Sequence, residues 1–417
     1  MRRHQLEAYL DKVFDWTVAV ATMTEGRRNP THRWSKVFDA VFLASACRFG
    51  PVHRIEAECH NGVLRKRIGP LSEDTIRYAL QRQSPDEVFD LGCRVARQLK
   101  RNGVLRSDWA RGQVVAAVDG IEICSSYSRC CETCLERTVQ RKVNDKLEEW
   151  TQYYHRLSAV TVVSTRFPIF LGIRFQKPGE SEVACSLALL QELVAKLGKR
   201  FVDILVADAL YLQTPFIRAV EPLGLDWVIN LKDNQPELAA EAERLTHRPA
   251  DDHDSSAPQQ LQLWHLPEVD WPVADRLVRI VKTVRVQKAN RVTVRQQQGR
   301  PIREKQPAPI VSTNYYATNV ELGTIPPSFI HQLGRSRWVI DAQAFQTITT
   351  DCHLKQPSVH QSCALVVLTM IRVLAYTLAM VFYYRQLRSH ARTCPPSFCE
   401  MARLLGYQFL APRLDSS

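Results

Sequence analysis

The order of apolar segments between residues 113 and 207 constrains the fold more than any other feature of the sequence. Short apolar runs rich in β-branched and aromatic residues predict strands, and a longer run rich in Leu and Ala predicts a helix. The predicted strands are Gln113–Val118, Tyr153–Thr165, Pro168–Phe175 and Val202–Ala207, and the predicted helix, Val183–Leu197, lies before the last of them.

Three strands, a helix and a fourth strand are the order of an RNase H-like core, an α/β fold in which helices flank a mixed sheet. One more strand is expected at Asp226–Lys232, so the first part of this core occupies residues 109–232. We expect a β-rich insertion at 233–327 and a helical completion of the core at 328–417.

Residues 1–108 are predicted to be helical, because apolar residues recur there at helical spacing. Ser72, followed by two acidic residues, has the pattern of a helix start. This N-terminal domain is either a small DNA-binding domain or a module for packing or dimerisation. Its sequence contains no helix-turn-helix signature that would decide between them.

Composition narrows the class of protein. Hydrophobic residues make up 45% of the 417 and charged residues 24%, as in an ordinary folded protein. A formal charge of +12 favours a polyanionic partner, although a merely basic soluble protein has the same balance. The twelve cysteines lack the spacing of a disulfide scaffold, and no apolar signal core follows the N-terminus, so we expect an intracellular, reducing compartment.

The apolar segment Ala364–Tyr384 is long enough to span a membrane, but Arg372 stands near its centre. A charged arginine there costs about 2.5–3.5 kcal/mol on insertion scales. We therefore predict a buried core helix and no membrane partner.

Asp119 and Asp208 are the strongest candidates for chemistry, because each follows a predicted apolar strand. A carboxylate at the end of a buried strand is costly unless it binds a cation or joins a hydrogen-bond network. A single aspartate in that place is more often a turn former or helix cap. Two of them within this strand order favour a site for Mg²⁺, which prefers oxygen ligands.

From about Val114 to Ser362 the chain resembles the bacterial insertion-sequence DDE transposases whose third motif has Arg, three residues, then Glu on a helix. The segments that carry the resemblance are VDGIEICSS (Val118–Ser126), YYHRLSAV (Tyr153–Val160), ILVADALYLQ (Ile204–Gln213), DWVINLKDNQPEL (Asp226–Leu238) and RWVIDAQAFQTI (Arg337–Ile348).

The resemblance implies a metal-dependent enzyme that cuts DNA and transfers the cut strand. Asp119, Asp208 and Asp341 would be its catalytic carboxylates and would hold two Mg²⁺ ions, with Mn²⁺ as a substitute, and Arg337 would contact DNA near the cleaved phosphate. The partners would be double-stranded DNA, as element ends and target, and a second copy of the chain when DNA is bound. The location would be the bacterial cytoplasm, at the nucleoid.

Three positions depart from the third motif of that family: its Glu is Asp341 here, its Tyr is Gly334 and its Lys is Ile348. These departures predict weak activity. They also keep two alternatives open: a catalytically inactive DNA-binding protein derived from a transposase, and an RNase H-like nuclease that cuts without strand transfer.

The insertion contains basic residues at every third position from Arg276 to Arg291, interleaved with Val and Ile. Their β-branched neighbours predict a strand with positive charge on both faces. Arg279, Lys282 and Arg285 are therefore candidates for binding the DNA backbone, and a charged, solvated edge hairpin is the alternative. Trp264 and Trp271 are expected to be packing residues rather than base-stacking ones.

Four cysteines lie close together at positions 124, 130, 131 and 134, and His155 follows. Cys131 and Cys134 have the spacing of half a zinc site. Because no clean second pair follows, the pattern favours reduced free thiols over zinc holding this loop.

Overall fold

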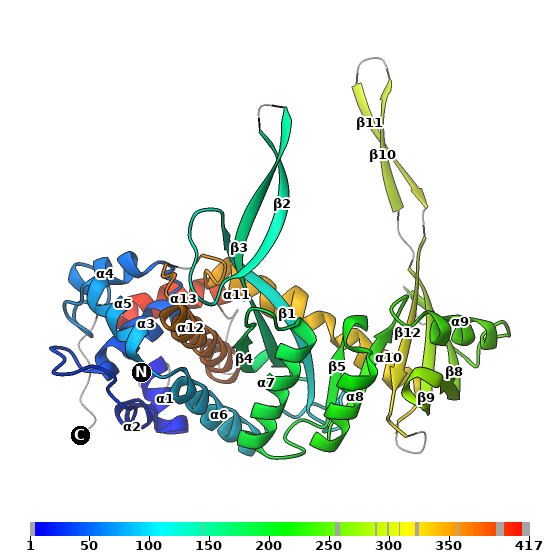
Figure 1. The fold of residues 1–417 in the computed structure, drawn as a ribbon, viewed down its shortest axis with the longest axis horizontal. Helices are drawn as coiled ribbons and strands as arrows, with labels where there is room; N and C mark the ends of the chain where they lie inside the picture. Colours follow the sequence, from blue (N-terminus) through cyan, green and yellow to red (C-terminus); the bar gives the residue numbers. More distant parts are fainter. Residues whose placement is uncertain are drawn as a thin grey trace. The chain divides into compact units, whose positions relative to one another are not determined.

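The computed structural model describes residues 5–143, 145–254, 259–287, 290–297, 300–307, 309–321, 325–356, 358–388 and 396–410 (Figure 1). The chain divides into two compact units. The first comprises Met1–Phe201 and Trp338–Ser417, and the second comprises Val202–Arg337. The domain boundaries expected from the sequence remain predictions.

Helices fill the N-terminal part of the first unit, as predicted. They are α1 (Leu6–Phe14), α2 (Trp16–Ala21), α3 (Trp34–Ala46), α4 (Val52–His60), α5 (Glu73–Arg82) and α6 (Pro85–Arg101). The predicted helix start at Ser72 is confirmed, because its side chain accepts a hydrogen bond from the Thr75 backbone N–H at 3.2 Å.

The apolar segment near the C-terminus forms α12 (Ser362–Phe382), which packs against α3, α5 and α6 (Figure 1). Among the described residues, Ser362–Leu387 is the one helix long and apolar enough to cross a membrane, and 89% of its most apolar window is buried within the fold. The prediction of a buried core helix is confirmed.

Arg372 lies inside this helical core with only 3% of its surface exposed. Its guanidinium donates to the backbone carbonyls of His353, at 3.1 Å, and Gly50, at 2.5 Å. Burial lowers the pKa of Arg372 to about 10, so the group stays protonated at neutral pH. A single arginine thus ties α12 to two loops that lie far apart in the sequence.

The remaining helices of the first unit come after its strands in the sequence. They are α7 (Glu182–Leu197), η5 (Ile340–Phe345), α11 (Gln346–Asp351), η6 (Tyr383–Leu387) and α13 (Phe398–Phe409).

The sheet of the first unit is built around one long strand, β3 (Lys146–Val162). One edge of β3, from Tyr153 to Val162, pairs with β1 (Val115–Ser126). Its other edge is shared by β2 (Leu135–Val143) near the start and β4 (Ile169–Phe175) near the end. All of these pairings are antiparallel, as the first three strands of an RNase H-like core require.

Two features of this sheet differ from the sequence expectation. β1 does not end before Asp119 but continues to Ser126, because Asp119 and Gly120 keep extended backbone and pair with Ala159 and Ser158 of β3. In addition, β2 and the first part of β3 form a long hairpin that projects from the sheet (Figure 1).

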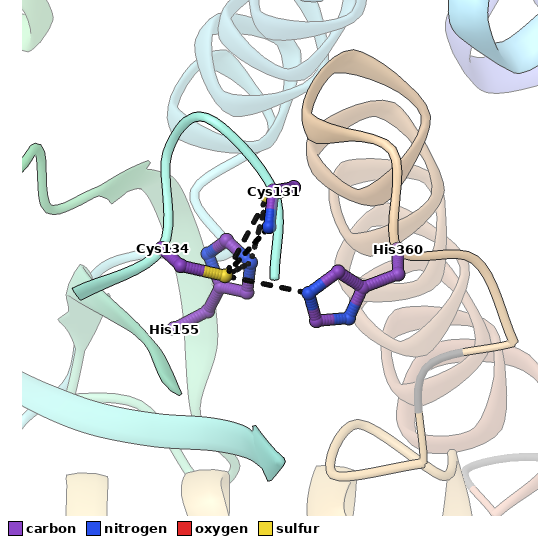
Figure 2. A group of neighbouring side chains, drawn as sticks. All are labelled: Cys131, Cys134, His155 and His360. Atoms are coloured by element: carbon purple, nitrogen blue, oxygen red, sulfur yellow. Dashed lines mark hydrogen bonds between the residues drawn. The ribbon is translucent and has the colours of Figure 1, made fainter. Parts of the chain in front are cut away.

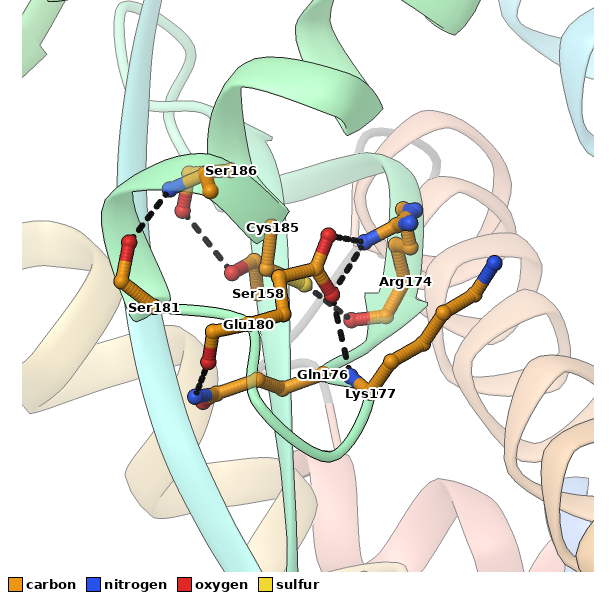
Figure 3. A network of polar contacts seen from close by, with 9 residues as sticks. Ser158, Arg174, Gln176, Lys177, Glu180, Ser181, Cys185 and Ser186 are labelled. Carbon is orange, nitrogen blue, oxygen red and sulfur yellow. Dashed lines mark hydrogen bonds and ion pairs between the residues drawn. The ribbon is translucent and has the colours of Figure 1, made fainter. Parts of the chain in front are cut away.

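A polar network fixes the start of α7 on this sheet (Figure 3). The Ser186 hydroxyl donates to the hydroxyl of Ser158 on β3 at 2.8 Å. Arg174, at the end of β4, donates to both carboxylate oxygens of Glu180 at 2.7 and 2.8 Å. The Ala184 N–H donates to the Ser181 hydroxyl, which caps the helix. These hydrogen bonds fix the position of the start of α7 relative to β3 and β4, next to the part of β1 that carries Asp119.

The strands of the second unit pair in a mixed pattern. β5 (Ile204–Ala207) and β6 (Asp226–Leu231) are parallel, and β12 (Ile310–Thr318) pairs antiparallel with β6. The sheet continues antiparallel from β12 through β9 (Arg276–Gln287) and β8 (Gln259–Trp271) to β7 (Asp252–Asp254). The β-rich character expected for this region is confirmed.

Short helices and one separate hairpin complete this unit. The helices are η2 (Ala209–Tyr211), α8 (Thr214–Val220), η3 (Glu221–Leu223), α9 (Pro236–Leu245), η4 (Pro272–Ala274) and α10 (Pro327–Ser336), and the hairpin strands are β10 (Asn290–Gln297) and β11 (Arg300–Pro307). Trp271 is 1% exposed and donates to the Gln235 side chain, and Trp264 is buried and donates to the Arg248 carbonyl. Both tryptophans are packing residues, as expected.

Candidate active site

Asp119 lies on β1 at the point where the strand changes from buried to half-buried. The four residues before it are buried apolar side chains. At Gly120 an added Cβ would lie 2.6 Å from the carboxyl carbon of Glu182, so a side chain there would displace that carboxyl group. Glu182, at the start of α7, pairs with Arg156 on β3 at 2.5 Å. A second carboxyl group, which the sequence did not indicate, thus lies directly beside the backbone of the residue after Asp119.

Asp341 lies on η5, a π-helical segment, and is half-buried. A π-helix takes one more residue per turn than an α-helix, so it re-aims the side chains that it carries, and such segments are frequent at functional sites. η5 packs against β1. Asp119 and Asp341 therefore come from two elements that are in contact within the first unit.

Asp208 follows the buried strand β5 directly, as the sequence predicted, and is half-buried. Its carboxylate accepts the Leu210 backbone N–H at 2.7 Å and so caps η2. The turn is braced by Asn234, whose amide donates to the Ala209 carbonyl at 2.6 Å, and by Gln235, which donates to the Leu212 carbonyl. The segment after β6 thus holds the turn that follows Asp208. Asp208 belongs to the second unit, and its approach to the other two carboxylates remains a prediction.

The donor set of these three residues suits Mg²⁺. Each offers only carboxylate oxygens, which are the hard ligands that Mg²⁺ prefers. Each of the three residues is half-buried. Mn²⁺ accepts the same oxygen ligands.

The four predicted DNA-binding cations have different environments. Arg279 is 5% exposed and donates to His265 and to the carbonyls of Val320 and Ile325. Lys282 is 7% exposed and pairs with Glu243 at 2.8 Å.

These internal partners use the donors of Arg279 and Lys282, so both residues stabilise the sheet, an outcome that the charge pattern alone did not reveal. Arg285 is half-buried, and Arg337, at the end of α10, is buried.

The Arg285 charge acts on the neighbouring α10. Burial, followed by the charges of Arg335 and Arg285, lowers the pKa of His331 to about 4. Burial and then Arg285 also lower the pKa of Arg335. Arg285 and the exposed Arg335 therefore form a concentration of positive charge within the second unit.

Comparison with known proteins decides the family. The model of the transposase DDE domain matches residues 133–378, which is more than half of the chain. The chain belongs to the DDE transposase family. No curated protein matches it. The cryo-EM structure of a piggyBac transposase synaptic complex with hairpin DNA is similar, with a TM-score of 0.46 and 11% identity over 98% of this chain and 80% of that chain. At that distance no residue role is transferred from it.

Two departures of this transposase from the third motif have structural causes. Gly334 faces the ring of Tyr316 on β12, and an added Cβ would lie 2.1 Å from that ring. Tyr316 is buried, which raises its pKa to about 12, and it fills the space in which a side chain at position 334 would lie. Ile348 on α11 is fully buried, and an unpaired lysine at such a position would be costly.

The paired cysteines of this transposase lie beside two histidines. Cys131 and Cys134 precede β2, and both sulfurs lie within 3.4 Å of Nε2 of His155 on β3. His360, from the segment before α12, completes the group. Sequence reasoning missed His360, because it lies 226 residues from Cys134. The eleven cysteines that the structure describes are free thiols.

Proposed function

We propose that this DDE transposase catalyses divalent-metal-dependent cleavage and strand transfer of DNA in the transposition of a bacterial insertion sequence. The observation that carries the proposal is the packing of η5 against β1, which brings the elements of Asp341 and Asp119 together. Its place of action would be the bacterial cytoplasm, on nucleoid DNA.

Asp119, Asp208 and Asp341 would hold two Mg²⁺ ions. When bound, these ions supply activation of a water nucleophile and stabilisation of the leaving 3′ oxygen. The protein contributes rigid placement of the ligands. The pairing of β1 with β3 holds Asp119, and the Leu210 N–H orients Asp208. Glu182 adds negative charge beside Gly120, the residue after Asp119, and Arg156 partly offsets it.

Double-stranded DNA would be bound mainly through its phosphates. The net charge of +12 supports this, because each phosphate that a cation neutralises releases counterions. Arg285, close to the exposed Arg335, is the best placed of the cations predicted on β9. Arg337 would act near the scissile phosphate, and two copies of the chain would bind the two element ends. Arg279 and Lys282 would support β9 from within the sheet.

One specific observation favours a second candidate function. Asp341 is one methylene shorter than the glutamate of the third transposase motif. Ile348 is buried, and Gly334 lies against the ring of Tyr316. A transposase-derived protein that binds DNA without cutting it would tolerate all three changes.

The test begins with the DNA that flanks the gene, where inverted repeats define the element ends. A labelled duplex of one end with its flank is incubated with the chain in Mg²⁺, Mn²⁺ or Ca²⁺. We expect nicking in Mg²⁺ and Mn²⁺ and joining to a target duplex. Asp119→Asn, Asp208→Asn and Asp341→Asn should each lower nicking by about 100-fold or more. Asp145→Asn is the matched control, because Asp145 is 92% exposed at the tip of the β2–β3 hairpin.

Each other outcome points to a different function. Binding of the ends without nicking by the unaltered chain would support the inactive DNA-binding protein. Nicking without joined products would support the RNase H-like nuclease. Nicking that survives all three Asn variants would refute the assignment of the carboxylates.

A further inference from the structure

Four side chains of types that can bind metal, from three separate segments of the first unit, converge outside the carboxylate site (Figure 2). Cys131 and Cys134 come from the loop between β1 and β2, His155 from β3, and His360 from the segment between α11 and α12. Their two sulfurs and two ring nitrogens all lie within 4.8 Å of one another. Cys134 and His155 are buried, and the other two residues are half-buried.

The distances between these atoms match the edges of a zinc tetrahedron. Zinc binds sulfur at about 2.3 Å and nitrogen at about 2.0–2.1 Å, so tetrahedral angles give edges of about 3.8 Å for S–S and about 3.5 Å for S–N. The Cys131 and Cys134 sulfurs are 3.7 Å apart. Cys134 Sγ lies 3.4 Å from His155 Nε2 and 3.3 Å from His360 Nε2. The side chains thus already surround a volume of the size that the ion needs.

The types of ligand select the metal. Two thiolates and two imidazoles are soft and borderline donors, which favour zinc and disfavour the Mg²⁺ of the carboxylate site. A disulfide between Cys131 and Cys134 does not describe the site, because the sulfurs are far beyond the bonded distance of about 2.05 Å. Protein ligands fill all four positions, which is the mark of a structural site rather than a catalytic one.

We infer that Cys131, Cys134, His155 and His360 bind one structural Zn²⁺ ion. The site joins the β1–β2 loop and β3 to the segment that follows α11. β3 pairs with β1, the strand that carries Asp119, and Asp341 lies on η5, which α11 follows. The ion therefore anchors the C-terminal side of the helical segment that carries Asp341. This inference does not depend on whether the chain cleaves DNA.

The full chain, expressed with zinc in the medium and passed through a desalting column, is analysed for metal by mass spectrometry. We expect about one zinc per chain. The variants Cys134→Ser and His360→Ala should each lower the zinc content at least about tenfold. Cys130→Ser is the matched control, because Cys130 is exposed and adjacent in sequence but lies outside the group, and it should keep its zinc.

A second measurement covers the case in which a ligand variant fails to fold. Unaltered protein is stripped of metal and loaded with Co²⁺, which should give the visible bands of tetrahedral cobalt and a thiolate-to-cobalt charge-transfer band. Fewer than about 0.2 zinc per chain together with absence of these bands would overturn the inference. Loss of zinc from Cys130→Ser to the same extent as from Cys134→Ser would overturn the assignment of the ligands.

Discussion

Replacing Arg372 by leucine distinguishes a buried core helix from a membrane-spanning helix. The substitution should destabilise a core helix and should favour the insertion of a membrane helix. The Arg372 guanidinium donates to the carbonyls of His353, Gln356 and Gly50. In a membrane span, removing the charge from the centre would favour insertion by about 3 kcal/mol. In a buried core helix, the same change leaves three inward carbonyls without their charged donor.

The size of the loss follows from this geometry. A hydrogen bond from a charged donor contributes about 1.5–3 kcal/mol, so three of them contribute about 4.5–9 kcal/mol. Burial lowers the pKa of Arg372 from its ordinary value of 12.5 to about 10, and leucine avoids the desolvation cost of about 3 kcal/mol that this shift represents. We expect Arg372→Leu to destabilise the helical core by about 3 kcal/mol.

Hydrogen exchange of the peptides from α12, read by mass spectrometry in buffer without detergent, measures this change locally. A loss of 3 kcal/mol should accelerate exchange by about 100-fold. Arg403→Leu is the control, since Arg403 is 62% exposed and pairs only with Glu400 among the ion pairs of the described residues, and it should change exchange little. Unchanged or slower exchange in Arg372→Leu would refute the reasoning.

Three further predictions concern the site and its surroundings. Asp341→Glu extends the carboxyl group by about one bond length, so it should accelerate single-turnover cleavage by up to about 100-fold and leave DNA affinity nearly unchanged. If Asp119→Ala abolishes cleavage but Asp341→Glu does not accelerate it, this prediction is wrong. Gly334→Ala should lower the stability of the second unit by about 1–3 kcal/mol in thermal melts, because its Cβ meets the Tyr316 ring at 2.1 Å, and Tyr316→Leu should relieve much of this loss. His331 has a folded-state pKa of about 4, below its ordinary 6.5, so its neutral form is favoured in the fold. The unfolded chain then binds the proton first, and stability falls as pH drops from about 6.5 towards 4. A His331→Asn variant that loses as much stability as the unaltered chain between pH 7 and pH 5 would show that another group is responsible.

Local patterns in the sequence sufficed for much of the fold. The strand and helix order from residue 113 onward, the cap at Ser72 and the burial of α12 follow from apolar spacing and from residues that satisfy helix ends. Asp208 was located for the same reason, since it directly follows a short buried strand. Each of these features depends on residues that are close together in the sequence, so the sequence alone is enough to predict it.

Other features were decided only by contacts between distant segments. β1 continues past Asp119 because β3 supplies partners for it, whereas the apolar pattern stops at Val118. The charge pattern of β9 suggested a DNA surface, but Arg279 and Lys282 are buried, and acceptors on β8, on α9 and in the segment after β12 use their donors. His360 joins the cysteines only once α12 is packed in place. Periodicity reports which face of an element is apolar, but which element covers that face, and which polar groups it brings, is set by the packing of the whole chain.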